Sequence, residues 1–425
     1  MIIKGNFIYT PSLDQMVIRK NEYLVVEDGK VKTFYKALPP KYQTETVIDH
    51  TGALIIPAFN DLHIHAPQYI NRGIGFDKEL LPWLETYTFP MEAKYKDMDF
   101  ADRSYRLFLH RLWENGTLRF SAFATLHKEA TWHLMELTEQ SGLKAWIGKV
   151  NMDRNSPNYL CEDTSQSLQD TEELIQKVTT LQNVNYIITP RFVPSTTEAL
   201  MRGLGELVKK YDLPVQSHLS ENKSEIAWVK ELHPNIPTYT EVYEAFGLMP
   251  KGKTIMAHCI HLSEPEKAIL KERDVMMCHC AQSNADLSSG IMPLKENLDL
   301  GLRCCIASDI AGSHTPDMNR HIALSIELSK IYHMQHPEVK AITLPQALFL
   351  ATKQSGSFFG KVGSFEAGYA FDALVIETEE MPGFLQREPF EKLEQFIYDG
   401  KASNILERYV EGKKIPCPFG KSVIF

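Results

Sequence analysis

Short apolar runs alternate with helical patterns from about residue 57 to residue 361, and this alternation restricts the fold more than any other feature of the chain. The apolar runs are Phe120–Leu126, Ala145–Val150, Tyr186–Phe192, Leu213–His218, Thr254–His258, Val275–His279 and Arg303–Asp309. Apolar residues recur at helical spacing in Thr171–Leu181, Thr197–Lys210 and Asn319–His333. With a further strand around His63, the expected strands number eight. Eight strands alternating with helices predict an α/β fold, a (β/α)8 TIM barrel rather than an open sheet.

The two ends of the chain are also rich in strand-forming residues. The segments are Ile2–Thr10, Tyr23–Glu27 and Val31–Tyr35 near the N-terminus, and Asp372–Glu377 and Arg408–Lys414 near the C-terminus. Asp28-Gly29 is a hairpin turn signal. Neither end has enough strands to be stable alone, so we expect both to pack together as one small β-sandwich. The predicted domains are therefore residues 1–56 plus 362–425 as a composite β-sandwich, and residues 57–361 as the barrel.

Composition excludes several classes of partner. The 425 residues carry a net charge of −9, which argues against a general binder of nucleic acid. No apolar stretch approaches the roughly 20 residues that span a bilayer, and the first residues lack a secretory signal, so we expect no membrane partner. Seven cysteines without a repeating spacing suit a reducing compartment. We expect a cytoplasmic protein.

Polar residues gather at the carboxyl ends of the predicted strands, where barrels of this kind hold their active sites. They are His63 and His65 on strand one, Arg191 on strand four, His218 on strand five, His258 on strand six and Asp309 on strand eight. His63 and His65 share one face of their strand and form a half-site for zinc. A single H-x-H pair arises by chance roughly half a time in a chain this rich in histidine. Four histidines and one aspartate at strand ends on one side of a barrel predict a metal site.

Eight short segments resemble the amidohydrolase superfamily and, within it, the guanine deaminase family. They are His63-Ile-His-Ala-Pro-Gln-Tyr69, Tyr87-Thr-Phe-Pro90, Gly148-Lys-Val-Asn-Met-Asp153, Thr189-Pro-Arg-Phe192, Ser217-His-Leu-Ser-Glu221, Ala257-His258, Ser288-Ser-Gly290 and Ser308-Asp-Ile-Ala-Gly312. The resemblance covers essentially the whole chain. It implies zinc-dependent hydrolytic deamination of guanine to xanthine and ammonia, a small-molecule purine substrate and a homodimer.

The resemblance also implies a set of metal ligands. Residue by residue, these are His63, His65, His218 and Asp309, which would hold one Zn²⁺ per subunit, with Fe²⁺ as the alternative metal. Two-metal members of the superfamily use a carboxylated lysine at the end of strand four. This strand ends here in Thr189-Pro190-Arg191-Phe192, without a lysine, so we expect one metal.

Catalytic and substrate-binding roles follow from the same resemblance and from the chemistry of the side chains. His258 is expected beside the metal, where it would position the attacking water, while Asp309 would accept a proton from that water. Glu221, three residues beyond His218, is expected to carry protons from water to the ring nitrogen and then to the departing ammonia. The expected substrate contacts are Gln68, Arg191, Phe192, His218, Glu221 and Asp309, with Trp83 as a further wall of the pocket. A glutamine amide both donates and accepts, and an arginine offers paired donors.

Two alternatives remain open at this point. The ring could be another aminated heterocycle, such as an 8-oxopurine, a pterin or a triazine, or the barrel could be a non-catalytic scaffold. Ala281-Gln282 stands where the family usually has Pro-Asn, which puts the shape of the loops around the substrate in doubt. We interpret His127 and Cys278-His279-Cys280 as packing residues, because neither completes a metal site. Lys149 is interpreted as structural or as lying behind the site.

Overall fold

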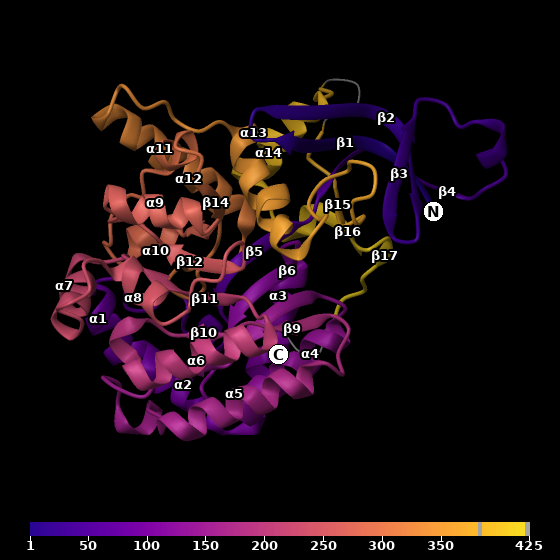
Figure 1. Cartoon of the computed structure of the whole chain (residues 1–425). Helices are drawn as coiled ribbons and strands as arrows, with labels where there is room; N and C mark the ends of the chain where they lie inside the picture. Colours follow the sequence, from indigo (N-terminus) through magenta and orange to yellow (C-terminus); the bar gives the residue numbers. More distant parts are fainter. Residues whose placement is uncertain (381–384, 421–425) are drawn as a thin grey trace.

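The computed structural model describes residues 1–380 and 385–420 and has the predicted α/β fold, a barrel joined to a small β domain (Figure 1). The domain division at 1–56 plus 362–425 remains a proposal, and residues 381–384 and 421–425 of its second segment lie outside the described residues. Strand β4 ends at Pro57 and β5 begins at Phe59, so the first proposed boundary, between residues 56 and 57, falls just before the last residue of β4.

The small β domain takes strands from both ends of the chain, as expected. These are β1 (Ile2–Ser12), β2 (Gln15–Glu27), β3 (Lys30–Tyr35), β4 (Val47–Pro57), β15 (Ala373–Ile376), β16 (Ile405–Val410) and β17 (Lys413–Lys414). They join in one seven-stranded sheet of order β17-β16-β15-β4-β1-β2-β3. The pair β1–β4 is parallel and the other neighbours are antiparallel. Strand β4, which leads into the barrel, therefore lies inside a sheet completed by the C-terminal strands.

The predicted hairpin turn at Asp28-Gly29 is confirmed. Glu27 of β2 pairs with Lys30 of β3, and the two residues between them have φ angles of 48° and 74°. Positive φ at both central positions is what a two-residue hairpin requires, and glycine adopts it without a steric penalty. A Cβ atom on Gly29 would also lie 2.5 Å from the carbonyl oxygen of Glu411. The turn therefore packs closely against the loop between β16 and β17.

The barrel strands follow the predicted order along the chain. They are β5 (Phe59–His65), β6 (Thr117–Phe123), β7 (Lys144–Gly148), β8 (Val150–Asn151), β9 (Val184–Tyr186), β10 (Thr189–Pro190), β11 (Val215–Leu219), β12 (Thr254–His258), β13 (Met276–His279) and β14 (Arg303–Ile306). The parallel sheets β5-β6-β7-β9 and β11-β12-β13-β14 form two halves. A parallel bridge between Ile188 and Val215 joins the halves on one side. On the other side the backbone N–H of Asp309 donates to His63, and that of His65 donates to Ile310.

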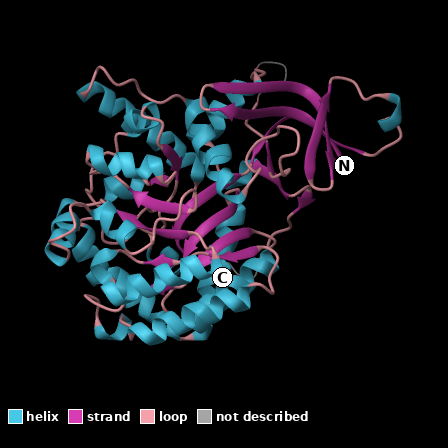
Figure 2. Cartoon of the chain, in the orientation of Figure 1, coloured by secondary structure: helices cyan, strands magenta, loops and turns pink. Residues whose placement is uncertain are grey.

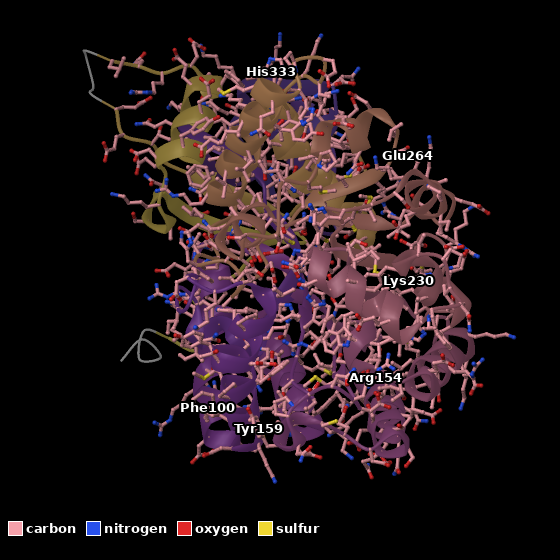
Figure 3. The ribbon with its side chains drawn as sticks, turned by 90° about the vertical axis from the view of Figure 1, so that its left-hand side faces the viewer. Phe100, Arg154, Tyr159, Lys230, Glu264 and His333 are labelled. Carbon is pink, nitrogen blue, oxygen red and sulfur yellow. The ribbon has the colours of Figure 1, made fainter. Side chains whose placement is uncertain are left out.

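Helices surround the barrel strands (Figure 2). They are α1 (Leu80–Trp83), α2 (Phe89–Glu92), α3 (Met98–Glu114), α4 (Lys128–Ser141), α5 (Thr164–Val178), α6 (Glu198–Tyr211), α7 (Lys223–Leu232), α8 (Tyr239–Ala245), α9 (Glu264–Glu272), α10 (Ala281–Asp286), α11 (Leu294–Asp299), α12 (Met318–Gln335), α13 (Leu344–Phe349) and α14 (Pro389–Asp399). Charged side chains such as Lys230 and Glu264 project from the outer helices into solvent (Figure 3). Among the described residues, the helices are too short or too polar to cross a membrane.

Three helices were predicted by apolar spacing, and all three are present. The expected Thr197–Lys210 corresponds to α6, whose first turn is capped by the Thr197 side chain accepting from the backbone N–H of Leu200. Helix α5 begins at Thr164, seven residues earlier than apolar spacing predicted. The side chain of Asp163 caps it by accepting from two backbone N–H groups. Capping by a polar side chain, not apolar spacing, determines where such a helix begins.

Three predicted strands end earlier than expected, and the first of them is β6, which ends at Phe123 instead of Leu126. The strand expected over Tyr186–Phe192 is divided into β9 and β10 and ends at Pro190, and β14 ends at Ile306 instead of continuing to Asp309. Asp309 has a φ of 51°, which takes its backbone out of the extended conformation. Where the backbone leaves the extended conformation, the polar side chains at the carboxyl ends of the barrel strands point toward one another.

A buried ion pair links the barrel to the β domain. The Nε atom of Arg119 on β6 donates to Oδ2 of Asp372 at 2.6 Å, and both side chains are at most 5% exposed. The other Asp372 oxygen accepts from the backbone N–H of Glu411 at 2.7 Å. Asp372 therefore connects the first half of the barrel with the strands that close the chain.

We expect Asp372→Asn to destabilise the whole chain. The change leaves the Arg119 guanidinium buried beside a neutral amide, and breaking such a pair costs about 3–5 kcal/mol of unfolding free energy. The measurement is denaturant unfolding of both variants beside the wild type. The control is Lys20→Gln, which removes the exposed pair with Glu388 and should cost at most about 1 kcal/mol. Equal losses in the two variants would contradict this account.

Candidate metal and substrate site

Closure of the barrel brings three of the predicted ligands together. His63 and His65 lie on β5, and Asp309 follows β14, the strand next to β5 around the barrel. Oδ1 of Asp309 lies 3.2 Å from Nε2 of His63 and 3.5 Å from Nε2 of His65. Residues that are 244 to 246 positions apart in the sequence thus face one another because two strands are neighbours.

His218, the fourth predicted ligand, enters from β11 on the opposite half of the barrel. Its Nδ1 donates to the backbone carbonyl of Arg191 at 2.6 Å, and this bond places the proton on Nδ1. Its Nε2 therefore presents a lone pair, and it lies 3.1 Å from Nε2 of His65. The hydroxyl of Tyr243 donates to the backbone carbonyl of His218 and keeps the strand in place.

The donor atoms of this cluster fit a bound cation. The ligand atoms of His63, His65 and His218 lie within 4.8 Å of one another. Burial lowers the pKa of all three imidazoles, so they are neutral and offer lone pairs. Among the described residues, neither ring nitrogen of His63 has a hydrogen-bond partner. Buried polar atoms are almost always hydrogen-bonded, so imidazole nitrogens that converge on one another and on Asp309 form an arrangement that a metal would satisfy.

His258 ends β12 beside the cluster. Its Nδ1 donates to Oδ1 of Asn284 at 2.8 Å, which leaves Nε2 directed at two carboxylates. Nε2 lies 3.4 Å from Oε2 of Glu221 and 3.7 Å from Oδ2 of Asp309. Burial by itself lowers the pKa of His258, but these two carboxylates outweigh that effect and raise it above its usual value. The imidazole can therefore hold a proton between two acceptors.

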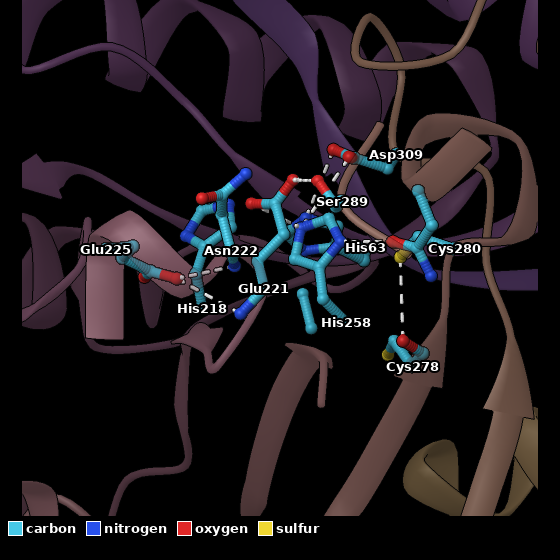
Figure 4. A network of polar contacts seen from close by, with 12 residues as sticks. His63, His218, Glu221, Asn222, Glu225, His258, Cys278, Cys280, Ser289 and Asp309 are labelled. Atoms are coloured by element: carbon cyan, nitrogen blue, oxygen red, sulfur yellow. Dashed lines mark hydrogen bonds and ion pairs between the residues drawn. The ribbon is translucent and has the colours of Figure 1, made fainter. Parts of the chain in front are cut away.

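Glu221 is a buried carboxyl group at the centre of this network (Figure 4). The hydroxyl of Ser289 donates to its Oε1 at 3.0 Å, and its backbone N–H donates to Glu225 at 3.0 Å. Burial raises the pKa of Glu221 from 4.5 to about 7. A carboxyl group with a pKa near neutrality can both accept and release a proton at that pH. Asp309, by contrast, has a lowered pKa: burial alone would raise it, but the surrounding histidines outweigh that effect.

Gln68 and Arg191, which line the cavity, meet at one carboxylate behind its wall. Nε2 of Gln68 donates to Oε1 of Glu92 at 2.7 Å, and Nη1 of Arg191 donates to Oε2 of the same residue at 2.7 Å. The guanidinium of Arg191 also lies over the ring of Phe89, 5.1 Å from its centroid. Sequence reasoning placed Gln68 and Arg191 in the pocket but did not identify Glu92.

A cavity of about 430 Å³ opens over these groups. Its polar lining comes from predicted residues together with Glu225, and its apolar lining includes Leu80, Trp83, Leu84, Phe192 and Leu287. The indole N–H of Trp83 donates to the backbone carbonyl of Ile74 at 2.9 Å, so the ring, and not its polar atom, serves as wall. A cavity with an apolar lining and a few converging polar groups has the form of a small-molecule site.

Four residues of the network were not predicted as site residues from the sequence. Glu225, Asn284 and Ser289 support Glu221 or His258, and Glu92 supports the substrate-facing pair. Ser289 and Asn284 belong to segments that resemblance had already drawn attention to, so closer reading of those loops could have found them. Nothing in the sequence near Glu92 indicates that it is buried.

The residues that the sequence analysis left out of the site have different surroundings in the structure. Lys149 is fully buried and lies 2.5 Å from Glu162, so it belongs to a structural ion pair away from the cavity. His127 and His279 do not fall within the clusters that could hold a metal among the described residues. Cys280 does: a ligand atom of this residue lies within 4.8 Å of those of His63, His258 and Asp309. Cys280 follows the last residue of β13 and also belongs to a buried apolar cluster, as the packing interpretation expects, so it packs in the core beside the candidate metal ligands.

Residues 54–415 match the amidohydrolase family. The match spans the barrel and the C-terminal strands of the β domain, and it begins within β4. The chain belongs to this family.

Relatives that match over their full length show which amidohydrolases this chain resembles in sequence. Guanine deaminase of Dictyostelium discoideum is 39% identical over 97% of this chain and 98% of its own length. Guanine deaminase of Homo sapiens is 37% identical over 99% of this chain and 98% of its own. The crystal structure of guanine deaminase from C. acetobutylicum with bound guanine in the active site has a TM-score of 0.96 and 48% identity, covering 98% of this chain and 99% of that one. Within the amidohydrolases, the chain falls among the guanine deaminases.

We expect His218→Asn to lose most of the bound metal. The change removes one of the converging lone pairs, because the shorter amide does not reach the position of Nε2. The measurement is elemental analysis of the purified variants after dialysis. The control is His127→Asn, which changes a histidine outside the cluster and should retain the metal content of the wild type. A His218 variant with full metal content would remove this residue from the ligand set.

Proposed function

We propose that this chain catalyses the hydrolytic deamination of guanine to xanthine and ammonia with one bound Zn²⁺. The observation that carries the proposal is the position of Glu221. Its buried carboxyl group, with a pKa of about 7, lies beside the His–Asp cluster in a cavity walled by Gln68 and Arg191. The guanine deaminases with full-length similarity support the choice of substrate.

The proposed ligands of the metal are His63, His65, His218 and Asp309. Neutral imidazoles and a carboxylate are ligands that zinc accepts, and Fe²⁺ is the alternative for the same donor set. When bound, the ion supplies Lewis acidity and makes a water molecule acidic enough to react near neutral pH. The absence of a lysine at the end of strand four supports a single metal.

The proton transfers are assigned to three residues. His258 Nε2 and Asp309 Oδ2 lie 3.7 Å apart beside the proposed metal ligands, and both would orient the reacting water through hydrogen bonds. Glu221 takes a proton from the water as the oxygen attacks the ring carbon that bears the amino group, and it gives this proton to the neighbouring ring nitrogen. Asp309 then accepts the second proton from the oxygen that is now bonded to the ring carbon, and Glu221 delivers a proton to the amino group. The carbon–oxygen double bond forms as the carbon–nitrogen bond breaks, and ammonia leaves. A pKa near 7 suits a group that must both accept and donate.

The purine is proposed to lie between polar and apolar walls. Gln68 and Arg191 would bond its edge, Phe192 would contact its face, and Trp83 would close the apolar side, since all four line the cavity. The other rings considered, an 8-oxopurine, a pterin or a triazine, have no specific observation in their favour. A non-catalytic scaffold would not require a buried carboxyl group of raised pKa beside a cluster of converging imidazoles.

Assembly and cellular location are also proposals. The resemblance supports a homodimer, and the chain composition supports a cytoplasmic enzyme. Each is open to direct measurement, by light scattering of the purified protein and by fractionation of the source cells.

We expect Glu221→Gln to retain the metal and lose about 10²–10⁴-fold in kcat for guanine, because an amide cannot transfer the protons. The measurement pairs turnover, by ultraviolet absorbance and ammonia release, with metal analysis. The matched control is Glu264→Gln, which changes an exposed carboxylate on α9 and should leave both values unchanged. Near-normal turnover by the Glu221 variant would contradict the assignment.

A substrate panel tests the identity of the ring. We expect the wild type to turn over guanine faster than an aminopterin-type ring or an aminotriazine, because the amide and guanidinium groups of the wall match a purine edge. A faster rate on either competitor would overturn the choice of guanine and leave the proton-transfer scheme intact.

A further inference from the structure

A buried carboxylate lies between the two polar residues proposed to hold the substrate. Glu92 ends α2, and its two oxygens accept hydrogen bonds from Gln68 and Arg191, both at 2.7 Å. All three residues are at most 3% exposed. The proton-transfer scheme does not use Glu92, and Glu92 does not line the cavity itself. Its influence on a bound ring would therefore pass through its two partners.

The bond to Glu92 determines which end of the Gln68 amide faces the cavity. A carboxylate only accepts hydrogen bonds, so the NH₂ group of Gln68 must point to it. The carbonyl oxygen of Gln68 is then left toward the cavity that Gln68 lines. Among the described residues, the Gln68 side chain makes no hydrogen bond other than the one to Glu92. The wall thus offers an amide oxygen as an acceptor.

Arg191, beside Gln68, offers hydrogen-bond donors to the cavity. Glu92 takes one of its N–H groups, and the ring of Phe89 supports the guanidinium from one face. A guanidinium has five N–H donors and no acceptor, so donors remain available on the side that lines the cavity. Acceptor and donor are therefore held side by side by one carboxylate.

We propose that Glu92 is a positioning residue that sets the polarity of Gln68 and Arg191, so that the wall selects a ring edge in which a carbonyl group adjoins a ring N–H. This inference rests on the proposed function for the placement of the ring in the cavity. Guanine has such a cyclic amide edge. A 6-aminopurine presents the reverse order, an amino donor beside a bare ring nitrogen, and meets Gln68 and Arg191 with like groups.

A purely structural role for Glu92 makes a different prediction. The pair Lys149–Glu162 shows what such a role looks like in the same barrel: a buried ion pair at 2.5 Å, remote from the cavity lining. Loss of a structural pair lowers stability and the fraction of folded enzyme. Loss of a positioning residue changes which ring is preferred.

The test is Glu92→Gln, which keeps the size of the side chain and replaces one oxygen with an NH₂ group. Arg191 can bond only the remaining oxygen, so the new NH₂ group faces Gln68 and forces the amide of Gln68 to turn. The cavity then meets the NH₂ group of Gln68 instead of its oxygen. We expect the preference for guanine over 2,6-diaminopurine, as the ratio of kcat/KM values, to fall about tenfold or more. The change should lie mainly in KM.

The exchange variant Glu92→Gln with Gln68→Glu provides a rescue. It keeps the total charge and the counter-ion of Arg191 nearby, and the carboxylate now at position 68 accepts from the amide at position 92 while directing its other oxygen to the cavity. We expect it to recover much of the lost preference for guanine. It also keeps the inference testable if the single variant does not fold.

Binding of hypoxanthine separates this inference from the proposed function. Hypoxanthine has the cyclic amide edge and lacks the amino group that leaves, so its dissociation constant reports on Gln68 and Arg191 without turnover. We expect weaker binding by Glu92→Gln, recovery in the exchange variant, and unchanged affinity in the control Glu162→Gln, which should lose only stability. Failure of the wild type to deaminate guanine would count against the proposed function alone.

Three results would overturn the inference. The first is a folded Glu92→Gln enzyme with the selectivity and hypoxanthine affinity of the wild type. The second is an exchange variant that folds and recovers nothing. The third is a wild type that does not bind hypoxanthine at all.

Discussion

The closure of the barrel between β5 and the residues after β14 is the constraint on which the site depends. Two backbone hydrogen bonds, Asp309 to His63 and His65 to Ile310, join the first and last strands. The buried carboxylate of Asp61 adds to this seam, because its Oδ1 accepts from the backbone N–H groups of both His63 and Ser308. A barrel left open at this seam would separate the histidines of β5 from Asp309. The seam that completes the fold is thus also the base of the metal cluster.

Burial shifts the pKa of each titratable side chain in the site, and neighbouring charged side chains oppose or outweigh that shift. The same removal from water that keeps His218 neutral raises the pKa of Glu221 to about 7. His258 escapes this effect because two carboxylates face its ring. Each reactive side chain also has a partner behind it, Arg191 for His218 and Ser289 for Glu221, on a different loop. The site is therefore a product of several loops held by one rigid set of strands.

Much of this arrangement follows from the sequence, and the reasons for the remainder are physical. Alternating patterns predicted the barrel because buried parallel strands need continuous apolar runs, and strand ends predicted His63, His218 and His258 because a barrel gathers those ends. Glu92 was not predicted because a buried carboxylate on a short helix resembles an exposed one until its partners are known. Asp163 shows the same limit for helix starts: the cap is local, whereas the predicted boundary relied on apolar spacing.

The residues that hold the site residues in place differ in how far they could be recognised from the sequence. Ser289 lies in a loop and Asn284 lies on the short helix α10, both in or near segments recognised in the sequence. Their polar character was therefore visible in the sequence, but their hydrogen-bond partners were not. Gln282, at the position that departs from the usual Pro-Asn, accepts from the backbone N–H of His314 at 3.2 Å, with Nε2 3.1 Å from that ring. The unusual residue therefore joins the loops after β13 and β14, a role that requires both loops to be seen together.

The position of β4 has a consequence for how the chain reaches this fold during synthesis. One edge of β4 pairs with β1, which is made before it, but the other edge pairs with β15, whose residues Ala373–Ile376 follow the entire barrel. A ribosome therefore releases the barrel strands while one side of β4, with the buried residues Leu54, Ile55 and Ile56, still lacks its neighbour. An unpaired strand edge is a template for association with other chains. The C-terminal strands thus cover the open edge of a sheet whose first strands are made at the start of synthesis. Chains interrupted late in translation would expose that edge and would be prone to aggregate.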